Sequence, residues 1–484
     1  MATVITSIGS KSDDSNPVNA QITLSNSSGS GTPWSGTVQY SSSDPTASVG
    51  DILHFKDVYY NCAGYGSCED GPLDVDYLIT AINTGTDTIT IRHIRGGIAD
   101  SVDPHSNLKS DSAGNTAAQP YIVRCFSSIS TWEADLDTDV FYDDGDTAQG
   151  EMYNDTTFEV TSGTTINGGG SLSGGSLDTR TLTAAVGQRH DGTANSGVRV
   201  LCTSTNSDLE VLVMDGSVGS AGGTGNQIQW IEVDCNEKDI RAGIRLYHYS
   251  GIQNCIVHGA RWCNSNNETV GIKSYSKNTW ICNCIVYDIE CDAGSSSSWG
   301  TAGMRIDQND WQVVTNNTVY GTKSNASVGL TTAYGIEVKS GGSYQRIYNN
   351  IAMGTASDNG TDTDFVTQTS TSYTDANYSS DTSAPGDTNY RSESAADTFV
   401  STSAGSEDFH LKNGSNALRV GKDAGANETV QGRRMPYSPY NWDVDINGRS
   451  RDTEGDDWDI GAHQCEDCSE GGAVTNTAFM FFVD

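Results

Sequence analysis

Short runs of alternating apolar and polar residues recur along the middle of the chain at nearly constant intervals. A unit of glycine, an apolar residue, a polar residue and a fourth position occurs four times, in steps of 28, 32 and 32 residues. Its copies are Gly243-Ile-Arg-Leu, Gly271-Ile-Lys-Ser, Gly303-Met-Arg-Ile and Gly335-Ile-Glu-Val. Each repeat, from one copy to the next, holds short apolar strands joined by polar turns and has no room for a helix. It cannot bury its apolar face alone, so successive repeats must stack into a shared core. The pattern predicts an all-β fold, a right-handed parallel β-helix.

A second apolar run follows each copy and begins at an asparagine. The four runs are Asn254-Cys-Ile-Val, Asn283-Cys-Ile-Val, Asn317-Thr-Val-Tyr and Asn350-Ile-Ala-Met. Asparagine tolerates the left-handed backbone of a tight turn, and stacked amide side chains hydrogen-bond to one another. We therefore expect these four asparagines to form one structural column at a turn.

Alternation along the first strand separates interior from exterior positions, since successive side chains of a strand point to opposite faces. Two columns are predicted to point inward: Ile244, Ile272, Met304 and Ile336, and Leu246, Ser274, Ile306 and Val338. Two columns are predicted to point outward: Arg245, Lys273, Arg305 and Glu337, and Tyr247, Tyr275, Asp307 and Lys339. Residues at equal offsets in neighbouring coils should lie about 4.8 Å apart.

The segments before and after the repeats have other patterns. Alternating runs between residues 50 and 92 predict antiparallel hairpins of a small β-domain. The segment 130–136 predicts a short helix with Ser130 as N-cap and Glu133 completing a capping box, suited to covering the open end of a solenoid. The predicted organisation is an arm or linker at 1–30, an inserted small β-domain at 31–125, the β-helix at 126–404 and a cap or oligomerisation segment at 405–484.

Composition restricts the partners. The chain of 484 residues carries a formal net charge of -35 and has a pI near 4.3. Such a surface repels phosphate, so no nucleic-acid partner is expected, although acidity also simply keeps a large β-protein soluble. No apolar run approaches the roughly 18 residues of a membrane span, and residues 1–7 lack the basic start and apolar run of a signal peptide. We expect a protein of a virion surface, which leaves the host cell by lysis.

The cysteines allow several interpretations. Cys62 and Cys68 lie in a Gly-rich turn and could form a local disulfide, whereas Cys465 and Cys468 form a single CxxC. One such pair is not enough for a typical zinc site. The cysteines of the repeat region are expected to be small buried residues between coils. They are Cys235, Cys255, Cys263, Cys282, Cys284 and Cys291.

The N-terminal Val4-Ile-Thr-Ser-Ile-Gly resembles the start of a group of phage β-helix proteins. In that group, segments like 127–136 and 150–155 of this chain follow almost at once, whereas about 115 residues intervene here. Residues 12–125 are therefore expected to be an inserted β-domain. The C-terminal Asp408-Phe-His-Leu and Asp459-Ile-Gly-Ala resemble the tail of many pectate-lyase-like β-helix proteins. The resemblance implies a virion-associated β-helix, and by analogy with β-helix spikes a homotrimer.

The outward cations and tyrosines predict a glycan-binding face. Tyrosine faces stack on sugar rings, and Arg or Lys pairs with sugar carboxylates or sulfates. The candidate residues are Arg245, Tyr247, Lys273, Tyr275 and Arg305. The alternative is that every β-helix exposes polar residues and that tyrosine merely suits strands.

The sequence contains no phosphate loop, nucleophile elbow or HExxH motif, and no catalytic residue is assigned. Cleavage of a polysaccharide requires two placed carboxylates, or a base beside a charge-neutralising cation. Asp307, Asp310 and Glu337 lie on adjacent predicted coils and are the candidates. With 62 acidic residues in the chain, such proximity also arises by chance.

The segment 443–454 matches the twelve-residue calcium loop, whose oxygen ligands alternate before a glycine turn. The candidate calcium ligands are Asp443, Asp445, Asn447 and Glu454. No helices are predicted to flank the loop, and Ser450 stands where such loops carry an apolar residue. The alternative is a turn-rich cap in which Arg449 pairs with Asp459. No other cofactor is expected.

The sequence thus predicts a bacteriophage virion surface protein of the tailspike, fibre or capsid-decoration type that contacts other virion proteins and binds host-surface polysaccharide without enzymatic activity. Two alternatives remain. One is a polysaccharide lyase or glycoside hydrolase built on a β-helix, and the other is a capsid decoration protein with no ligand, because the same fold serves all three roles.

Overall fold

The computed structural model describes residues 2–11, 20–23, 35–40, 47–58, 73–86, 88–94, 121–138, 140–170, 172, 176–216, 226–261, 268–291, 300–307, 312–325, 332–339, 345–367, 373–386, 390–422, 444–451, 458–465 and 468. The chain divides into two compact units. Unit 1 comprises Met1–Phe158, Ile166–Gln188 and Val218–Gly223, and unit 2 comprises Glu159–Thr165, Arg189–Ser217 and Thr224–Asp484. Strands β9 (Phe158–Val160) and β10 (Thr164–Ile166) lie at the division between them.

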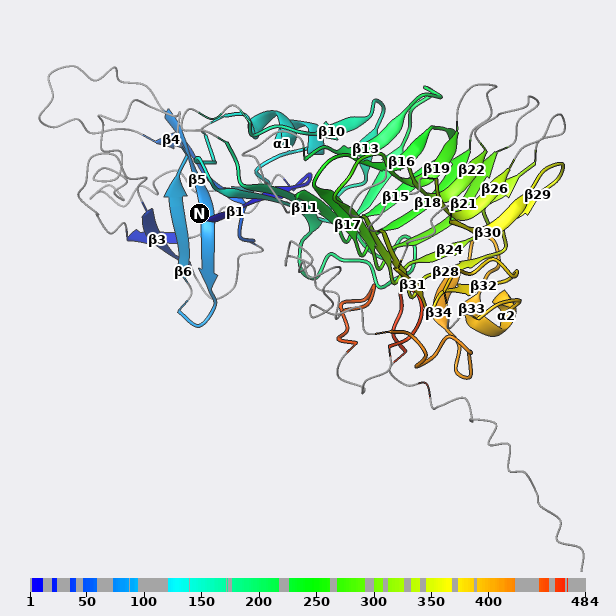
Figure 1. Ribbon diagram of the computed structural model, residues 1–484. Coiled ribbons are helices and arrows are strands. Elements are labelled where there is room, and N and C mark those ends of the chain that lie inside the picture. Colours follow the sequence, from blue (N-terminus) through cyan, green and yellow to red (C-terminus); the bar gives the residue numbers. More distant parts are fainter. Residues whose placement is uncertain are drawn as a thin grey trace, which may run out of the picture. The chain divides into compact units, whose positions relative to one another are not determined.

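Unit 2 is a parallel β-helix whose coils each contribute one strand to three parallel sheets (Figure 1). Sheet 1 contains β13 (Glu210–Met214), β16 (Ala242–Leu246), β19 (Thr269–Ser274), β22 (Thr301–Ile306), β26 (Ala333–Val338) and β30 (Asp362–Thr367), in that order. Sheet 2 contains β12 (Arg199–Cys202), β15 (Glu232–Asp239), β18 (Ile256–Arg261), β21 (Ile285–Cys291), β24 (Thr318–Tyr320), β28 (Ile351–Met353) and β32 (Tyr378–Ser379), extended by β25 (Lys323–Ser324) and β29 (Ala356–Ser357). Sheet 3 contains β14 (Asn226–Gln229), β17 (Ser250–Gln253), β20 (Thr279–Cys282), β23 (Gln312–Thr315), β27 (Gln345–Tyr348) and β31 (Tyr373–Asp375).

The predicted inward columns of sheet 1 are confirmed. Ile244 pairs with Ile272, which pairs with Met304, and all three side chains are completely buried. The glycine before each of them is required by close packing, because a Cβ on Gly271 would lie 2.4 Å from Val286 Cγ1 and 2.7 Å from the Gly303 carbonyl oxygen. Truncating a core residue such as Ile272 to alanine should cost about 2–5 kcal/mol of stability, since the stacked coils cannot collapse into the cavity.

The predicted asparagine column is wrong by one residue in its last two members. Pairing of Ile285 with Thr318 and of Thr318 with Ile351 fixes the register of sheet 2. The column that precedes these strands by two residues is Asn254, Asn283, Asn316 and Asn349, all with φ between 51° and 56°. Asparagine is common there because it adopts this left-handed backbone at low cost.

Asn317 and Asn350 belong to the next column, which Cys255 and Cys284 share in earlier coils. The buried Asn317 Nδ2 donates to Asn350 Oδ1 at 2.9 Å, and Asn350 Nδ2 donates to Asn377 Oδ1 at 3.1 Å. Asn317 and Asn350, two of the four predicted residues, thus form the expected stacked amide ladder, but with Asn377 and not with Asn254 and Asn283.

The C-terminal region of unit 2 lies along the outer face of sheet 2. We call its described part, residues 399–422, 444–451 and 458–465, the C-terminal strap. It contains β33 (Phe399–Ser401) and β34 (Asp408–Leu411), an antiparallel pair that follows the short helix α2 (Ala395–Thr398). Its apolar side chains form one buried cluster with those of sheet 2: Ile256, Ile285, Tyr287, Ile351, Met353, Phe399, Phe409, Leu411, Ile446 and Ile460. The segment expected to cap the helix thus covers a side of several successive coils.

Turn asparagines hold the strap in place. Asn254 Nδ2 donates to the Asp445 carbonyl, although the two residues are 191 positions apart in sequence. In the next coil, Asn283 Nδ2 donates to the Val444 carbonyl at 2.7 Å. Asn349 Oδ1 accepts from Lys422 N at 2.7 Å, so three members of the column contact the strap.

Unit 1 contains a parallel set of β1 (Thr3–Ile8), β8 (Thr147–Met152) and β11 (Thr179–Ala184). It also contains an antiparallel sheet of β2 (Ala20–Thr23), β3 (Ser35–Tyr40), β6 (Thr88–His93), β5 (Leu73–Asn83), β4 (Ile52–Val58) and β7 (Tyr121–Val123), in that spatial order. The chain leaves the parallel set near Lys11 and returns at Arg124, whose N–H donates to the Lys11 carbonyl at 3.0 Å. The antiparallel sheet is therefore an excursion that begins and ends at one place.

The predicted short helix is present as α1 (Ile129–Asp135), but its N-cap is Ser128 and its capping box is closed by Thr131. The prediction of Ser130 and Glu133 for these roles was wrong, because the helix begins one residue before Ser130. The buried Trp132 anchors α1 within unit 1, and its Nε1 donates to Tyr142 Oη at 3.0 Å. Among the described residues, no helix is both long and apolar enough to cross a membrane.

Candidate functional site

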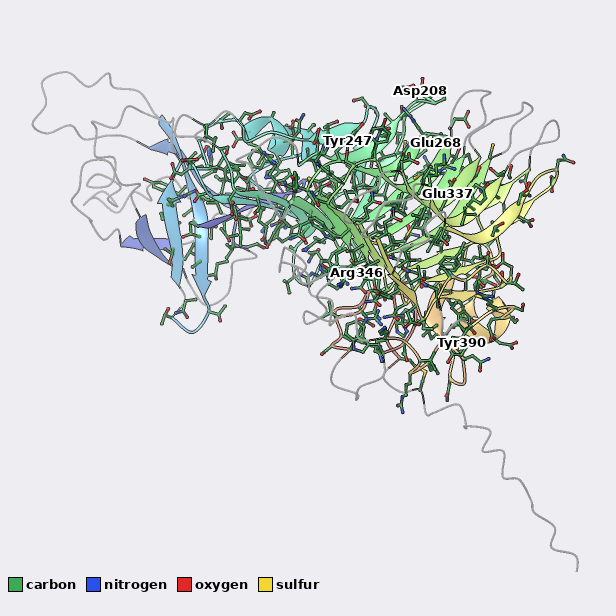
Figure 2. All side chains as sticks on the ribbon, in the orientation of Figure 1. Asp208, Tyr247, Glu268, Glu337, Arg346 and Tyr390 are labelled. Carbon is green, nitrogen blue, oxygen red and sulfur yellow. A yellow bond between two sulfur atoms is a disulfide. The ribbon has the colours of Figure 1, made fainter. Side chains whose placement is uncertain are left out.

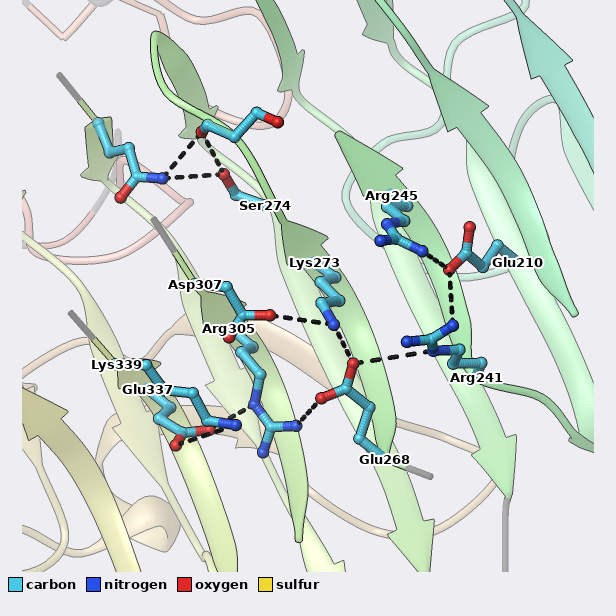
Figure 3. Close-up of polar contacts among 12 residues, drawn as sticks. Glu210, Arg241, Arg245, Glu268, Lys273, Ser274, Arg305, Asp307, Glu337 and Lys339 are labelled. Carbon is cyan, nitrogen blue, oxygen red and sulfur yellow. Dashed lines mark hydrogen bonds and ion pairs between the residues drawn. The ribbon is translucent and has the colours of Figure 1, made fainter. Parts of the chain in front are cut away.

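The outward column of sheet 1 is in register as predicted, with Arg245 opposite Lys273, Lys273 opposite Arg305 and Arg305 opposite Glu337. These side chains are nevertheless buried: Arg245 is 7% exposed and Arg305 is completely covered. Their charged groups join carboxylates and further cations in a continuous network (Figure 3). We call this network the ion-pair ladder: Glu210, Arg241, Arg245, Glu268, Lys273, Arg305, Asp307, Glu337 and Lys339.

Glu268 is the central acid of the ladder. It lies just before β19 and forms ion pairs with Lys273 and with Arg305, the latter at 2.5 Å. Arg305 also contacts Glu337 at 2.5 Å, so its guanidinium bridges two carboxylates across neighbouring coils. Lys273 contacts Asp307 at 3.0 Å. Because every buried charge has an opposite charge beside it, the cost of burying these ions is offset.

The pKa values change along the ladder. Burial alone would raise the pKa of Glu268, but Arg305 and Lys273 outweigh it and lower that pKa to about 2. At the other end, burial raises the pKa of Glu337 despite the attraction of Arg305. Burial and repulsion by Arg305 lower the pKa of Lys339, which contacts Glu337 at 3.9 Å. At this end of the ladder the pKa of Glu337 is raised and that of Lys339 is lowered, so the proton affinities of the two groups become more similar.

An aromatic pair flanks the ladder. The rings of Tyr247 and Tyr275 lie 5.8 Å apart at an interplanar angle of 66°. The Arg245 guanidinium lies 4.6 Å from each ring centroid, which fixes the rings by cation–π contact. Tyr275 is 41% exposed, so part of its side chain remains accessible although its ring contacts the Arg245 guanidinium. Figure 2 shows Tyr247 on the same side of unit 2 as Glu268 and Glu337, and far from Tyr390.

The predicted glycan-binding residues thus lie together, but the cations are buried in ion pairs and the tyrosines are at least partly exposed. Arg245, Lys273 and Arg305 use their charges on carboxylates of the protein, whereas Tyr275 and part of Tyr247 face outward. Sequence analysis did not identify Glu210, Arg241 and Glu268 as members. No repeat pattern connects them, because Glu268 lies three positions before Gly271, Arg241 lies two before Gly243, and Glu210 pairs with Ala242, one before Gly243.

Of the candidate catalytic carboxylates, Asp307 and Glu337 are both members of the ladder. Each is close to a cation, Asp307 to Lys273 and Glu337 to Arg305 and Lys339. Asp310 lies outside the described residues.

The described part of the predicted calcium loop is a closed turn. Asp445 is completely buried, and its Oδ1 accepts from the N–H groups of Asn447 and Arg449, both at 2.9 Å. Its Oδ2 accepts from Gln464 N at 3.0 Å. Asp443 and Glu454 lie outside the described residues, so the calcium site stays a prediction.

Among the described residues, Asp459 is contacted by the Arg451 side chain and not by that of Arg449, its predicted partner. Arg451, completely buried, donates to the carbonyls of Asp459, Gly461 and Ala462 at 3.2, 2.9 and 3.1 Å. The Asp459 carboxylate instead accepts from the backbone of Arg419 and Cys465.

The cysteines separate into two groups. Cys465 and Cys468 form a disulfide. Five repeat cysteines are buried and belong to no disulfide, as expected: Cys235, Cys255, Cys282, Cys284 and Cys291. Cys62, Cys68 and Cys263 lie outside the described residues.

Comparison with known proteins gives a weak similarity in structure. No protein-family model and no curated protein sequence matches the chain. Among solved structures, the chain is similar to the crystal structure of pectate lyase Pel9A at 14% sequence identity and a TM-score of 0.25, over 70% of this chain and 92% of that chain.

Proposed function

We propose that the protein binds an extended polysaccharide along the outer face of sheet 1 and does not cleave it. The observation that supports this proposal is the Tyr247–Tyr275 pair, because it offers a sugar ring an accessible aromatic surface that is already rigid. Tyrosine provides contact area at a low entropic cost when its ring is held in advance. The two tyrosines belong to adjacent coils, so the surface that they form runs in the stacking direction of the coils, as an extended polymer requires.

Binding without cleavage is favoured because the carboxylates of the ladder are already engaged. A glycosidase needs one carboxylate that is free to attack or to activate water and a second that donates a proton. Asp307 and Glu337 are instead next to Lys273 and Arg305, at 3.0 and 2.5 Å. Releasing either carboxylate would leave Lys273 or Arg305 with only the shared Glu268 to balance its buried charge.

We place this binding activity on the surface of a bacteriophage particle, as a tailspike, fibre or decoration protein and as a homotrimer. The proposal is supported by the phage-like sequence segments 4–9 and 150–155. In unit 1 these segments begin in the adjacent parallel strands β1 and β8 and run past their ends, with the antiparallel sheet as an excursion between them. Purified particles should contain the chain at a fixed symmetric copy number, measured by mass spectrometry and electron microscopy. A chain that is absent from particles would contradict this part of the proposal alone.

The binding proposal is tested by affinity electrophoresis against a panel of neutral and acidic polysaccharides. At least one polymer should retard the wild-type chain, and Tyr275→Ala should weaken the retardation by up to about tenfold, since one aromatic contact contributes about 0.5–1.5 kcal/mol. Tyr390→Ala is the matched control, because Tyr390 also belongs to a tyrosine pair of unit 2, with Tyr378 at 5.9 Å. Equal retardation of the two variants would overturn the assignment of this face.

Cleavage of a uronate-containing polysaccharide is the second candidate function, and the Glu337–Lys339 end of the ladder favours it. A lysine with a lowered pKa is a candidate base for abstracting the proton beside a sugar carboxylate, and burial and Arg305 lower the pKa of Lys339. Release of unsaturated oligosaccharides by the wild type, but not by Lys339→Met, would establish a lyase and refute non-catalytic binding.

A further inference from the structure

Outside the ladder, a histidine and two carboxylates meet on the outer face of sheet 2. Asp234 and His258 are paired across β15 and β18, and Glu232 lies two residues before Asp234 and therefore on the same face. One donor atom from each of the three side chains lies within 4.8 Å of the other two. The same outward column continues through Tyr287, Tyr320 and Met353, so the trio stands where the face changes from apolar to polar.

The donor atoms are held in place by surrounding contacts. His258 Nε2 lies 3.0 Å from Glu232 Oε1, and its ring stacks on Tyr287 at 4.8 Å and an angle of 8°. Glu232 Oε2 accepts from Asn195 N at 2.6 Å, and Asp234 Oδ1 accepts from Asn236 N at 2.7 Å. Metal-binding carboxylates and imidazoles are oriented by outer contacts of this kind.

The donor set selects the class of ion. Imidazole nitrogen with two carboxylates suits Zn²⁺ and similar transition metals, whereas Ca²⁺ and Mg²⁺ prefer oxygen ligands in larger number. Glu232 is completely buried, and Asp234 and His258 are partly exposed, which leaves access for the ion and for a water as a fourth ligand. Arg199, 3.5 Å from Asp234 Oδ2, offsets one of the two negative charges, so the trio attracts a divalent cation only moderately.

We propose that Glu232, Asp234 and His258 bind one divalent transition-metal ion, with Zn²⁺ fitting best, and that the ion ties two successive coils together. The ion would replace the proton that His258 and Glu232 share, and small side-chain rotations would bring the three donors to the usual 2.0–2.2 Å from zinc. The site is independent of the glycan-binding face on sheet 1. It is also separate from the predicted calcium loop, since its ligands come from β15 and β18.

The test is equilibrium dialysis of the full chain against Zn²⁺ in a buffer with excess Mg²⁺, which occupies exposed carboxylates. The wild type should retain one equivalent of Zn²⁺, measured by elemental mass spectrometry. His258→Gln and Asp234→Asn should each weaken binding about tenfold or more. Two matched controls should bind like the wild type: His410→Gln, which alters another His–Asp pair, and Asp288→Asn, which removes one charge from the next coil of the same sheet.

Two further measurements keep the result interpretable. Co²⁺ should give the spectrum of a nitrogen and oxygen site without thiolate absorption, which excludes the cysteines as ligands. The wild type should melt at a higher temperature with Zn²⁺, and Asp234→Asn, which keeps the shape of the side chain, should lose that shift even if His258→Gln folds poorly. Failure of the wild type to retain Zn²⁺, or equal retention by Asp234→Asn and Asp288→Asn, would show that the trio is only a hydrogen-bonded ion pair.

Discussion

Sheet 2 turns apolar side chains such as Ile285 outward and covers them with the C-terminal strap, whereas sheet 1 turns charged side chains such as Arg305 outward and neutralises them with neighbouring carboxylates. Both faces end up buried, but by different physics. The first gains from removing apolar area from water, and the second must offset the desolvation of ions by pairing them. The apolar face of sheet 2 is covered by the strap, which lies far along the sequence. The ions of sheet 1 are paired with carboxylates on the same or neighbouring coils, within hydrogen-bond distance.

The difference has a consequence for function. The strap leaves little of sheet 2 accessible where it packs, and the metal-binding trio lies at the polar end of that face. The ladder on sheet 1 holds its own charges while leaving Tyr275 exposed. The face that carries the proposed glycan site is therefore the one whose stability depends on electrostatics.

The largest expected effect is that of Arg305→Met. The substitution leaves Glu268 and Glu337 buried without their shared cation, and should reduce the free energy of unfolding by about 3–5 kcal/mol. Urea denaturation followed by circular dichroism measures the loss. Adding Glu337→Gln should recover part of it, because one uncompensated charge is then removed. A cost below about 1 kcal/mol, the value for an exposed ion pair, would show that the ladder is open to water and that the comparison of the faces fails.

A smaller effect is expected from acid, and it concerns the strap face. In the neutral form of the buried His190 both ring nitrogens have a hydrogen-bond partner: Nε2 donates to the Asn254 carbonyl at 2.9 Å, and Nδ1 accepts from Gly192 N at 3.3 Å. Burial lowers the pKa of His190 from 6.5 to about 4 and that of His463, in the strap, to about 2. Both folded pKa values lie below the unfolded one, so this stability is complete above about pH 6.5 and is lost progressively as the pH falls from there toward the folded pKa values.

Between about pH 7.5 and pH 5, each of the two histidines should lower the free energy of unfolding by about 2 kcal/mol. The measurement is the urea midpoint of the wild type and of His190→Gln at both pH values. The variant should be less sensitive to acid because glutamine does not titrate. His410→Gln, a partly exposed histidine, is the control and should keep the sensitivity of the wild type. A His190→Gln variant that is as acid-sensitive as the wild type would contradict the assignment.

The sequence was sufficient for whatever depends on strand alternation and repeat spacing. The inward column of Ile244, Ile272 and Met304 follows from these two regularities, and so does the register of Arg245 with Lys273. The asparagine column was misjudged because later coils carry the doublets Asn316-Asn317 and Asn349-Asn350. Only the pairing of the following strands decides which asparagine of a doublet continues Asn254 and Asn283.

Contacts between distant segments could not be predicted. Alternation places Arg305 on the outer face, but not the carboxylate of Glu268, which lies 37 residues earlier, against it. Nor does any local pattern pair Asn283 with Val444, 161 residues later. The outward direction of a side chain is a property of its strand, whereas its exposure depends on what the rest of the chain lays over it.

The smallest expected effect separates the two roles of the turn asparagines. Asn283→Gly keeps the left-handed backbone, φ 51°, but removes the amide that donates to the strap, and should cost about 1 kcal/mol. Asn316→Gly is the matched control in the next coil, since Asn316 accepts from Asn349 at 3.0 Å within the β-helix. Global stability should fall similarly in both variants. Hydrogen exchange of Ile446, whose N–H bonds to the Ala462 carbonyl, should accelerate only in Asn283→Gly, because only that variant loosens the strap. Equal exchange in the two variants would mean that apolar packing alone holds the strap against sheet 2.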